Sequence, residues 1–316
     1  MTEHRRAALP YRVALRRHLV AEGWTDASIR AAVGSGVLVR LRWGGYVFAC
    51  GDTVAERDLH RLRAHAVWEA SRADTVLSHT SALAELDVGL WDLPWDDVHV
   101  TRRDGRSGRR LSGVVRHRGL LDDSEIEKTR GGAVMTTPAR AAIDTARLVD
   151  VEHAMVMFDA LLGARIVTRD DLQAAYSRSE VWRDSRHIRI ALMLAAVGAG
   201  SVGESRLRFL CFRFGLPKPE LQYEVRDSSG HLIGYVDLAW PELGVLIEFD
   251  GKEKYSKYAR PGESPADVVF REKVREDRLR ELGYVVVRVT WADLRRPDAV
   301  AQRLRRAIAV AASTRR

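Results

Sequence analysis

Three carboxylates and two lysines fall close together in the C-terminal third of the sequence. Asp237 stands in one apolar run, and Glu248 and Asp250 stand in the next, after a turn at residues 241–244. If those four residues form a hairpin loop, Asp237 faces Glu248, and Asp250 shares their face because side chains alternate along a strand. Like charges directly opposed destabilise a sheet, so this arrangement requires a compensating cation. Oxygen ligands favour Mg²⁺ or Mn²⁺ over Zn²⁺, and we predict a metal site at these three carboxylates.

The lysines just beyond this hairpin are candidates for the positive charge of a catalytic site. The sequence has six lysines, and Lys252 and Lys254 belong to a group of three within six positions. A lysine ammonium is a compact charge whose pKa responds to its surroundings. We expect one of the two to orient a water molecule or to stabilise charge on a phosphate in the transition state. The alternative is that these are ordinary polar residues on a solvated sheet.

The elements that must position these residues extend from residue 201 to the end of the chain. Apolar periodicity, interrupted by turn and cap residues, predicts the order helix, three strands, helix, strand and a final helix. The expected ranges are 202–214, 220–226, 232–240, 244–250, 264–282, 284–291 and 297–312. We therefore expect a compact αβββαβ domain.

This region resembles a known enzyme superfamily. The text "GYVDLAWPELGVLIEFDGKEKY", followed by "REKVREDRLRELGYVVVRVTW", is similar to the PD-(D/E)XK nucleases, in particular to the branch of the very-short-patch repair endonucleases. The resemblance implies a restriction-endonuclease-like fold in which Asp237 and Glu248 bind the metal. Asp250 stands where the superfamily usually has lysine. The resemblance therefore leaves the catalytic ammonium to Lys252 or Lys254.

Glu204 allows two interpretations. By resemblance it is the helix acid that supports the metal or its water, and it joins the candidate catalytic residues. Ser201 precedes it by three residues, which is the spacing of a capping box in which the glutamate returns to the backbone at the helix start. The two roles are compatible, and the sequence does not choose between them.

The start of the chain predicts a small DNA-binding unit. Helical spacing covers residues 11–22, Thr25 can cap a second helix, and residues 37–49 indicate a basic hairpin. This is the outline of a winged helix, whose second helix enters the major groove. The predicted DNA contacts are Ser28 and Arg30 on the second helix and Arg40 and Arg42 on the hairpin. The alternative is a helical cap that only packs on the next domain.

The middle of the chain predicts a mixed α/β domain. A long helix over 53–73 precedes strands at 98–101 and 114–117. The loop between the strands holds Arg106, Arg109 and Arg110. These guanidinium groups are predicted to contact DNA phosphates, and a solvated charged loop is the alternative. His79 and His153 have no partner at ligand spacing, so both are predicted to be structural.

The N-terminal part of the chain resembles a second family. The segments "TDASIRAAVGSGVLVRLRWGGYVFA", "LSHTSALAELDV" and "MTTPARAAID" are similar to the AbiEi-type antitoxin proteins. The resemblance implies a winged helix joined to a mixed α/β domain, repression of transcription, and a toxin or defence-system partner.

Composition limits the classes of function. The chain has 316 residues and a formal net charge of +8, and the excess lies at its two ends, with +5 in residues 1–50 and +5 in residues 201–316. Basic surfaces at both ends fit a polyanionic partner. Two cysteines outside any ligand spacing argue against a disulfide scaffold or zinc finger and favour a cytoplasmic protein. No apolar run reaches the ~18 residues of a membrane span, so no membrane partner is expected.

Together these features predict a multi-domain α/β protein. The expected domains are a winged helix over 1–50, a mixed α/β domain over 51–200 and a nuclease-like domain over 201–316. We predict a Mg²⁺- or Mn²⁺-dependent endonuclease that hydrolyses phosphodiester bonds in DNA. The alternative is an antitoxin-type transcriptional regulator whose nuclease fold is inactive. The residues do not distinguish DNA from RNA, and they predict no oligomeric state.

Overall fold

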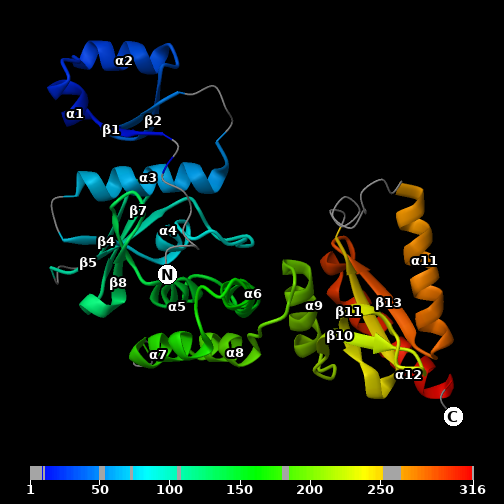
Figure 1. The fold of residues 1–316 in the computed structure, drawn as a ribbon. Coiled ribbons are helices and arrows are strands. Elements are labelled where there is room, and N and C mark those ends of the chain that lie inside the picture. The colour runs from blue at the N-terminus through cyan, green and yellow to red at the C-terminus, as the bar shows by residue number, and fades with distance from the viewer. Residues whose placement is uncertain are drawn as a thin grey trace. The chain divides into compact units, whose positions relative to one another are not determined.

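A computed structural model describes residues 9, 11–49, 54–71, 74–104, 108–179, 185–251 and 265–314 of the chain. Its contacts divide the chain into two compact units, Met1–Met193 and Leu194–Arg316. Both units combine helices with sheets, which confirms the α/β fold class (Figure 1). Within the described ranges, no helix is both long enough and apolar enough to cross a membrane.

The first unit begins with a three-stranded sheet and two short helices. Their bounds are β1 Val13–Leu15, α1 Arg16–Ala21, α2 Asp26–Gly34, β2 Leu38–Arg42 and β3 Gly45–Phe48, and the strand order is β1-β3-β2. The prediction of a helix over 11–22 is wrong for its first half, because residues 13–15 form a strand and the helix begins at Arg16. Val13 and Leu15 instead pair with Val47 and Gly45 and pack in one apolar cluster, while Ala14 between them packs in another.

A longer helix, α3 (Glu56–Ala70), leads into a six-stranded sheet with the order β6-β7-β5-β4-β9-β8. The strands are β4 Thr75–Leu77, β5 Val98–Arg102, β6 Arg109–Leu111, β7 Val114–Arg118, β8 Ile126–Lys128 and β9 Val134–Thr136. The helices are α4 His79–Leu83, α5 Pro138–Ala146, α6 Val151–Gly163, α7 Arg169–Ser179 and α8 Arg186–Leu194. The strands predicted at 98–101 and 114–117 are confirmed as β5 and β7, which run parallel.

The arginine-rich segment between β5 and β7 is only partly a loop. Residues 109–111 form β6, which pairs antiparallel with β7 at the edge of the sheet. Leu111 pairs with Val114 across Ser112 and Gly113, and both turn residues have positive φ, at 39° and 73°. A two-residue hairpin turn with positive φ at both positions matches the twist of the strands, so the chain reverses here tightly.

The second unit has the expected order of one helix, three strands, a helix and a strand, followed by a last helix. The elements are α9 Val202–Arg213, β10 Glu220–Arg226, β11 Leu232–Trp240, β12 Val245–Asp250, α11 Pro265–Glu281, β13 Val285–Thr290 and α12 Pro297–Thr314. The strand order is β10-β11-β12-β13. β11 and β12 are antiparallel, whereas β12 and β13 are parallel and are joined through α11.

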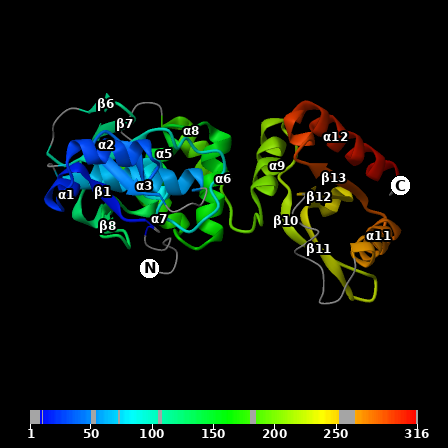
Figure 2. The same cartoon turned by 90° about the horizontal axis from the view of Figure 1, so that it is seen from above.

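Helices cover both faces of this sheet. Leu207 of α9 and Leu304 of α12 share one apolar cluster with Ile247 and other residues of the strands. Leu279 of α11 packs with Leu246 in a second cluster, on the opposite face. Figure 2 shows α9 and α12 on one side of the strands and α11 on the other. The face that carries Glu248 therefore lies under α11.

The alternation of side chains along β11 slips at Asp237. Leu238 lies in the cluster with α9 and α12, as period two predicts, but Val236 lies in the cluster with α11. Strict alternation would place Val236 on the face of Leu238, and the structure departs from it here. At this position the side chain of Asp237 accepts a hydrogen bond from the backbone N–H of Phe249 on β12 at 2.7 Å.

Candidate functional site

Asp237 stands where the ladder between β11 and β12 ends. The pairing runs from Trp240↔Val245 to Leu238↔Ile247, as the predicted register requires, and Asp237 is the next residue on β11. Its Oδ2 accepts the Phe249 N–H, which a strand carbonyl would otherwise satisfy. The carboxylate therefore takes over the role of the backbone where the two strands separate.

Glu248 follows directly after the last ladder pair on β12. Its side chain is 13% exposed, and it carries an arginine at each oxygen. Arg275 of α11 donates from Nη1 to Oε1 at 2.6 Å, and the Nε of Arg288 on β13 lies 3.5 Å from Oε2. The cation that the opposed carboxylates require is thus present as two guanidinium groups of the chain itself.

Arg275 is in turn fixed to the other strand. Its Nη2 donates to the carbonyl oxygen of Tyr235 on β11 at 2.6 Å. One guanidinium therefore joins β11 to Glu248 of β12 on the side of the sheet that α11 covers. The two bonds hold the planar group in one orientation, because both donors belong to the same rigid fork.

Asp250 ends β12, half-buried, and lies beside Thr290 of β13 in the parallel register. Among the described residues, these carboxylates do not form a set of three whose ligand atoms all lie within 4.8 Å of one another. The predicted metal ligands Asp237, Glu248 and Asp250 are therefore neighbours on adjacent strands but are not gathered around one point. Lys252 and Lys254 lie outside the described residues.

Glu204 is buried at the start of α9, with 3% of its surface exposed. Its Oε2 accepts the N–H of Gly200 at 2.8 Å, and its Oε1 accepts the hydroxyl of Ser201 at 2.8 Å. Ser201 caps the helix by accepting the Glu204 N–H. The capping interpretation therefore agrees with the hydrogen bonds, although the glutamate reaches the N–H of Gly200 and not that of Ser201 itself.

Gln222 of β10 is a site residue that the sequence analysis missed. It lies between the pairs Leu221↔Leu238 and Tyr223↔Val236, so counting places it opposite Asp237. Its Nε2 donates to Glu204 Oε2 at 3.0 Å, and its backbone has a φ of +47°. A left-handed glutamine is uncommon and costs free energy. Counting across the β10–β11 hairpin could have found it.

A glycine brings α9 close to this end of the sheet. A Cβ on Gly203 would lie 2.0 Å from Cε1 of Phe249, so only glycine allows the helix start to approach so closely. Phe249 also meets Trp291 edge to face, with ring centroids 5.0 Å apart. The candidate site is therefore built on a tightly packed base, with Glu204 and Asp237 on elements that meet at Phe249.

The predicted DNA contacts on α2 differ in how available they are. The hydroxyl of Ser28 accepts the N–H of Thr25 at 2.9 Å, and Thr25 accepts the N–H of Ser28 at 3.1 Å. These reciprocal bonds form a capping box, so Ser28 is engaged in starting the helix. Arg30 is exposed.

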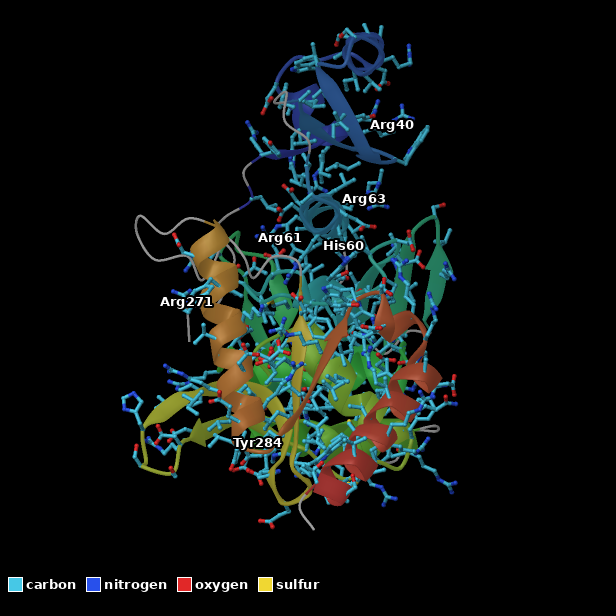
Figure 3. The ribbon with its side chains drawn as sticks, turned by 90° about the vertical axis from the view of Figure 1, so that its right-hand side faces the viewer. Arg40, His60, Arg61, Arg63, Arg271 and Tyr284 are labelled. Carbon is cyan, nitrogen blue, oxygen red and sulfur yellow. The ribbon has the colours of Figure 1, made fainter. Side chains whose placement is uncertain are left out.

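The two arginines of the β2–β3 hairpin also differ. Arg40 is exposed (Figure 3). Its guanidinium lies 5.9 Å from the ring of Trp43, which is itself 88% exposed. Arg42 is half-buried, burial lowers its pKa, and its Nε is buried with no hydrogen-bond partner among the described residues. The hairpin thus presents Arg40 and Trp43 to solvent, whereas Arg42 packs inward.

Three arginines of the middle domain are predicted to contact phosphates, and the structure describes the side chain of one of them, Arg110. It belongs to β6 and pairs with Asp97 at 2.7 Å, with its side chain 75% exposed. Arg109 belongs to the same strand, but its side chain is not among the described ones. Arg106 lies outside the described residues. The expectation that Arg109 and Arg110 lie in a loop is therefore wrong, because both belong to an edge strand.

No family model matches the chain. It is similar to two proteins of Mycobacterium tuberculosis, uncharacterized protein MT2308 of strain CDC 1551 / Oshkosh and uncharacterized protein Rv2248 of strain ATCC 25618 / H37Rv. Each is 28% identical to it over 294 residues, which cover 89% of this chain and 96% of the relative. The match is longer than either compact unit, so it extends into both.

Proposed function

We propose that the protein is an endonuclease that hydrolyses phosphodiester bonds in DNA, with its catalytic carboxylates in residues 194–316. The observation that carries this proposal is the position of Asp237, which follows the last ladder pair of β11 and β12 and accepts a hydrogen bond from Phe249, the neighbour of Glu248. Where the two strands diverge, these acidic side chains are held by the sheet, with Asp237 half-buried and Glu248 13% exposed. Phosphodiesters in RNA would offer the same chemistry.

The carboxylate oxygens of the candidate site are ligands that suit a hard divalent cation. Asp237, Glu248 and Asp250 offer only oxygen atoms, which Mg²⁺ and Mn²⁺ prefer. Such an ion, when bound, would polarise a phosphoryl oxygen and lower the pKa of a bound water. Glu248 can join the ligands only if Arg275 and Arg288 release its oxygens, so we expect these arginines to compete with the ion.

The remaining residues have positioning roles in this proposal. Gln222 and Glu204 hold each other beside Asp237, and the Phe249 N–H holds one oxygen of Asp237. Lys252 or Lys254 would supply the ammonium for the phosphate. Duplex binding would rest on Arg40 and the exposed ring of Trp43, with phosphate contacts supplying most of the affinity. We place this activity in the cytoplasm, as the low cysteine content favours.

The experiment that tests the proposal is nicking of supercoiled plasmid by the purified full chain with Mg²⁺ or Mn²⁺, and with a chelator. Asp237→Asn keeps an oxygen for the Phe249 N–H but removes the charge, and we expect it to lose about 100-fold or more in nicking rate. Asp298→Asn, an exposed position at the start of α12, is the matched control and should nick like the wild type. Equal nicking by wild type and Asp237→Asn would contradict the assigned site.

A DNA-binding regulator without cleavage is the second candidate. The ion pairs of Glu248 favour it, because two arginines already neutralise the carboxylate that an active site would need for metal. This candidate predicts duplex binding that is unchanged by a chelator and no nicking with either metal. The same plasmid assay, combined with fluorescence anisotropy of a labelled duplex, separates the two.

A further inference from the structure

Three histidines of the first unit meet on one face of its six-stranded sheet. His99 lies on β5 and His117 on β7, where His117 is level with Thr101, so both side chains emerge on the same face two residues apart. His79 is the first residue of α4 and comes from a separate part of the chain. Each offers one ring nitrogen, and all three nitrogens lie within 4.8 Å of one another.

The three rings are in direct contact. The Nδ1 of His99 and the Nε2 of His117 are 2.8 Å apart, so one ring donates to the other. The ring of His79 stacks on that of His117, with centroids 3.7 Å apart. His79 and His99 are buried and His117 is half-buried, so the cluster is closed on one side and reachable from the side of His117.

The backbone at His79 is strained. Its φ is +53°, in the left-handed region, and it is buried at the junction of β4 and α4. Such a conformation costs free energy in a residue with a Cβ, and it persists where the surroundings require the side chain in one place. Here it directs the imidazole onto His117.

The other nitrogen of His79 has a fixed partner. Nδ1 lies 3.0 Å from the hydroxyl of Ser78, which also receives a hydrogen bond from the hydroxyl of Thr101 at 2.9 Å. If Nδ1 carries the proton, Nε2 keeps its lone pair. Metal-binding histidines commonly donate their second nitrogen in this way, and the partner sets the tautomer and ring orientation.

We propose that His79, His99 and His117 bind a transition-metal ion of the Zn²⁺ class. Three imidazole nitrogens without a carboxylate suit Zn²⁺, Co²⁺ or Ni²⁺ and not Mg²⁺. Three protein ligands leave a fourth position for water, the arrangement of open zinc sites. The ion would replace the hydrogen bond between His99 and His117, with a ring nitrogen of His79 as the third ligand.

The proposal does not depend on the nuclease site, because the histidines lie in the other compact unit. It corrects the expectation that His79 has no partner at ligand spacing. The partners lie 20 and 38 residues further along the chain, on two strands that the fold makes neighbours, so no local spacing reveals them.

The experiment is equilibrium dialysis of the metal-free full chain against Zn²⁺, with metal content measured by mass spectrometry. We expect one Zn²⁺ per chain in the wild type. Ser78→Ala should weaken affinity about 10-fold, the lower end of the effect of an outer partner. His117→Ala should lose the site, and His153→Ala, which removes a half-buried imidazole of the same unit outside the cluster, should keep it.

A second measurement does not require a folded variant. Co²⁺ added to the wild-type chain should give the intense visible absorption of a four-coordinate nitrogen site, and Zn²⁺ should abolish it. Absence of Zn²⁺ and of this absorption from the wild type would overturn the proposal and leave a purely structural histidine cluster. Equal Zn²⁺ content in wild type and folded His117→Ala would overturn it as well.

Discussion

Arg275 of α11 and Glu248 of β12 form a charged hydrogen bond of 2.6 Å that lies across the sheet face expected to bind a metal. The same guanidinium bonds the carbonyl oxygen of Tyr235 on β11. Two strands and a helix are thereby tied together at one carboxylate. An ion that uses Glu248 must therefore weaken a structural contact, and this competition can be measured.

Arg275→Gln should lower the free energy of unfolding in the absence of metal by about 1–3 kcal/mol, since the largely buried Glu248 loses a charged donor. Saturating Mg²⁺ should then stabilise this variant more than the wild type, because binding to the folded state adds to stability. Urea unfolding with and without Mg²⁺ measures both effects.

Arg280→Gln on the same helix is the control for this change. Arg280 pairs with Glu276 but is 59% exposed, so its loss should cost less than about 1 kcal/mol and leave the response to Mg²⁺ as in the wild type. If Arg275→Gln and the wild type gain equal stability from Mg²⁺, the arginine does not compete with an ion at Glu248.

Asp237→Ala should destabilise the metal-free protein by about 1–3 kcal/mol, because the Phe249 N–H loses its acceptor in a buried strand. Asp237→Asn retains an acceptor oxygen and should lie within about 1 kcal/mol of the wild type. Chemical denaturation in the presence of a chelator compares the two. An alanine variant as stable as the asparagine variant would show that the hydrogen bond contributes little.

Arg40→Gln should lower the slope of log affinity against log salt for duplex binding by about 1, as expected when one phosphate contact is lost. Arg42→Gln should leave this slope unchanged, since Arg42 is half-buried and its Nε faces the interior. Fluorescence anisotropy at several salt concentrations gives the slopes. An unchanged slope for Arg40→Gln would remove the hairpin from the DNA interface.

Arg140 of α5 stabilises two buried acids, Glu125 and Asp144, with nitrogen–oxygen distances of 3.0 Å to each. Arg140→Met should cost about 3–5 kcal/mol, because both carboxylates lose their buried partner. Arg178 also pairs with Glu125 at 3.0 Å but is 49% exposed, so Arg178→Met should cost less than about 1 kcal/mol. Urea unfolding distinguishes them, and similar losses would contradict the role of burial.

The register of the β11–β12 hairpin could be predicted because it depends on local quantities. The four-residue loop and period-two alternation were sufficient to predict the pairs Trp240↔Val245 and Leu238↔Ile247. The slip at Val236 could not be predicted from alternation, which contains no information on the hydrogen bond between Asp237 and the Phe249 N–H. Local pattern likewise indicated the order of elements in the second unit but not the strand at β1.

The partners of the candidate residues depend on packing between distant segments. Arg275 follows Glu248 by 27 residues and reaches it only because α11 crosses the face of the sheet. Gln222 reaches Glu204 from the edge strand, and His79 meets two strands that are neighbours only in the folded sheet. Such contacts determine which charges are available, and sequence spacing contains little information about them.

The central claim is that Asp237 and its neighbouring carboxylates hydrolyse phosphodiesters, and single-turnover cleavage of a labelled DNA duplex tests it most directly. With Mg²⁺ and protein in excess, wild-type chain should convert the duplex to shorter products, a chelator should stop the reaction, and Asp237→Asn should bind equally but cleave about 100-fold more slowly or not at all. A wild type that binds the duplex but never cleaves it with Mg²⁺ or Mn²⁺ would contradict the claim and leave the regulator in its place.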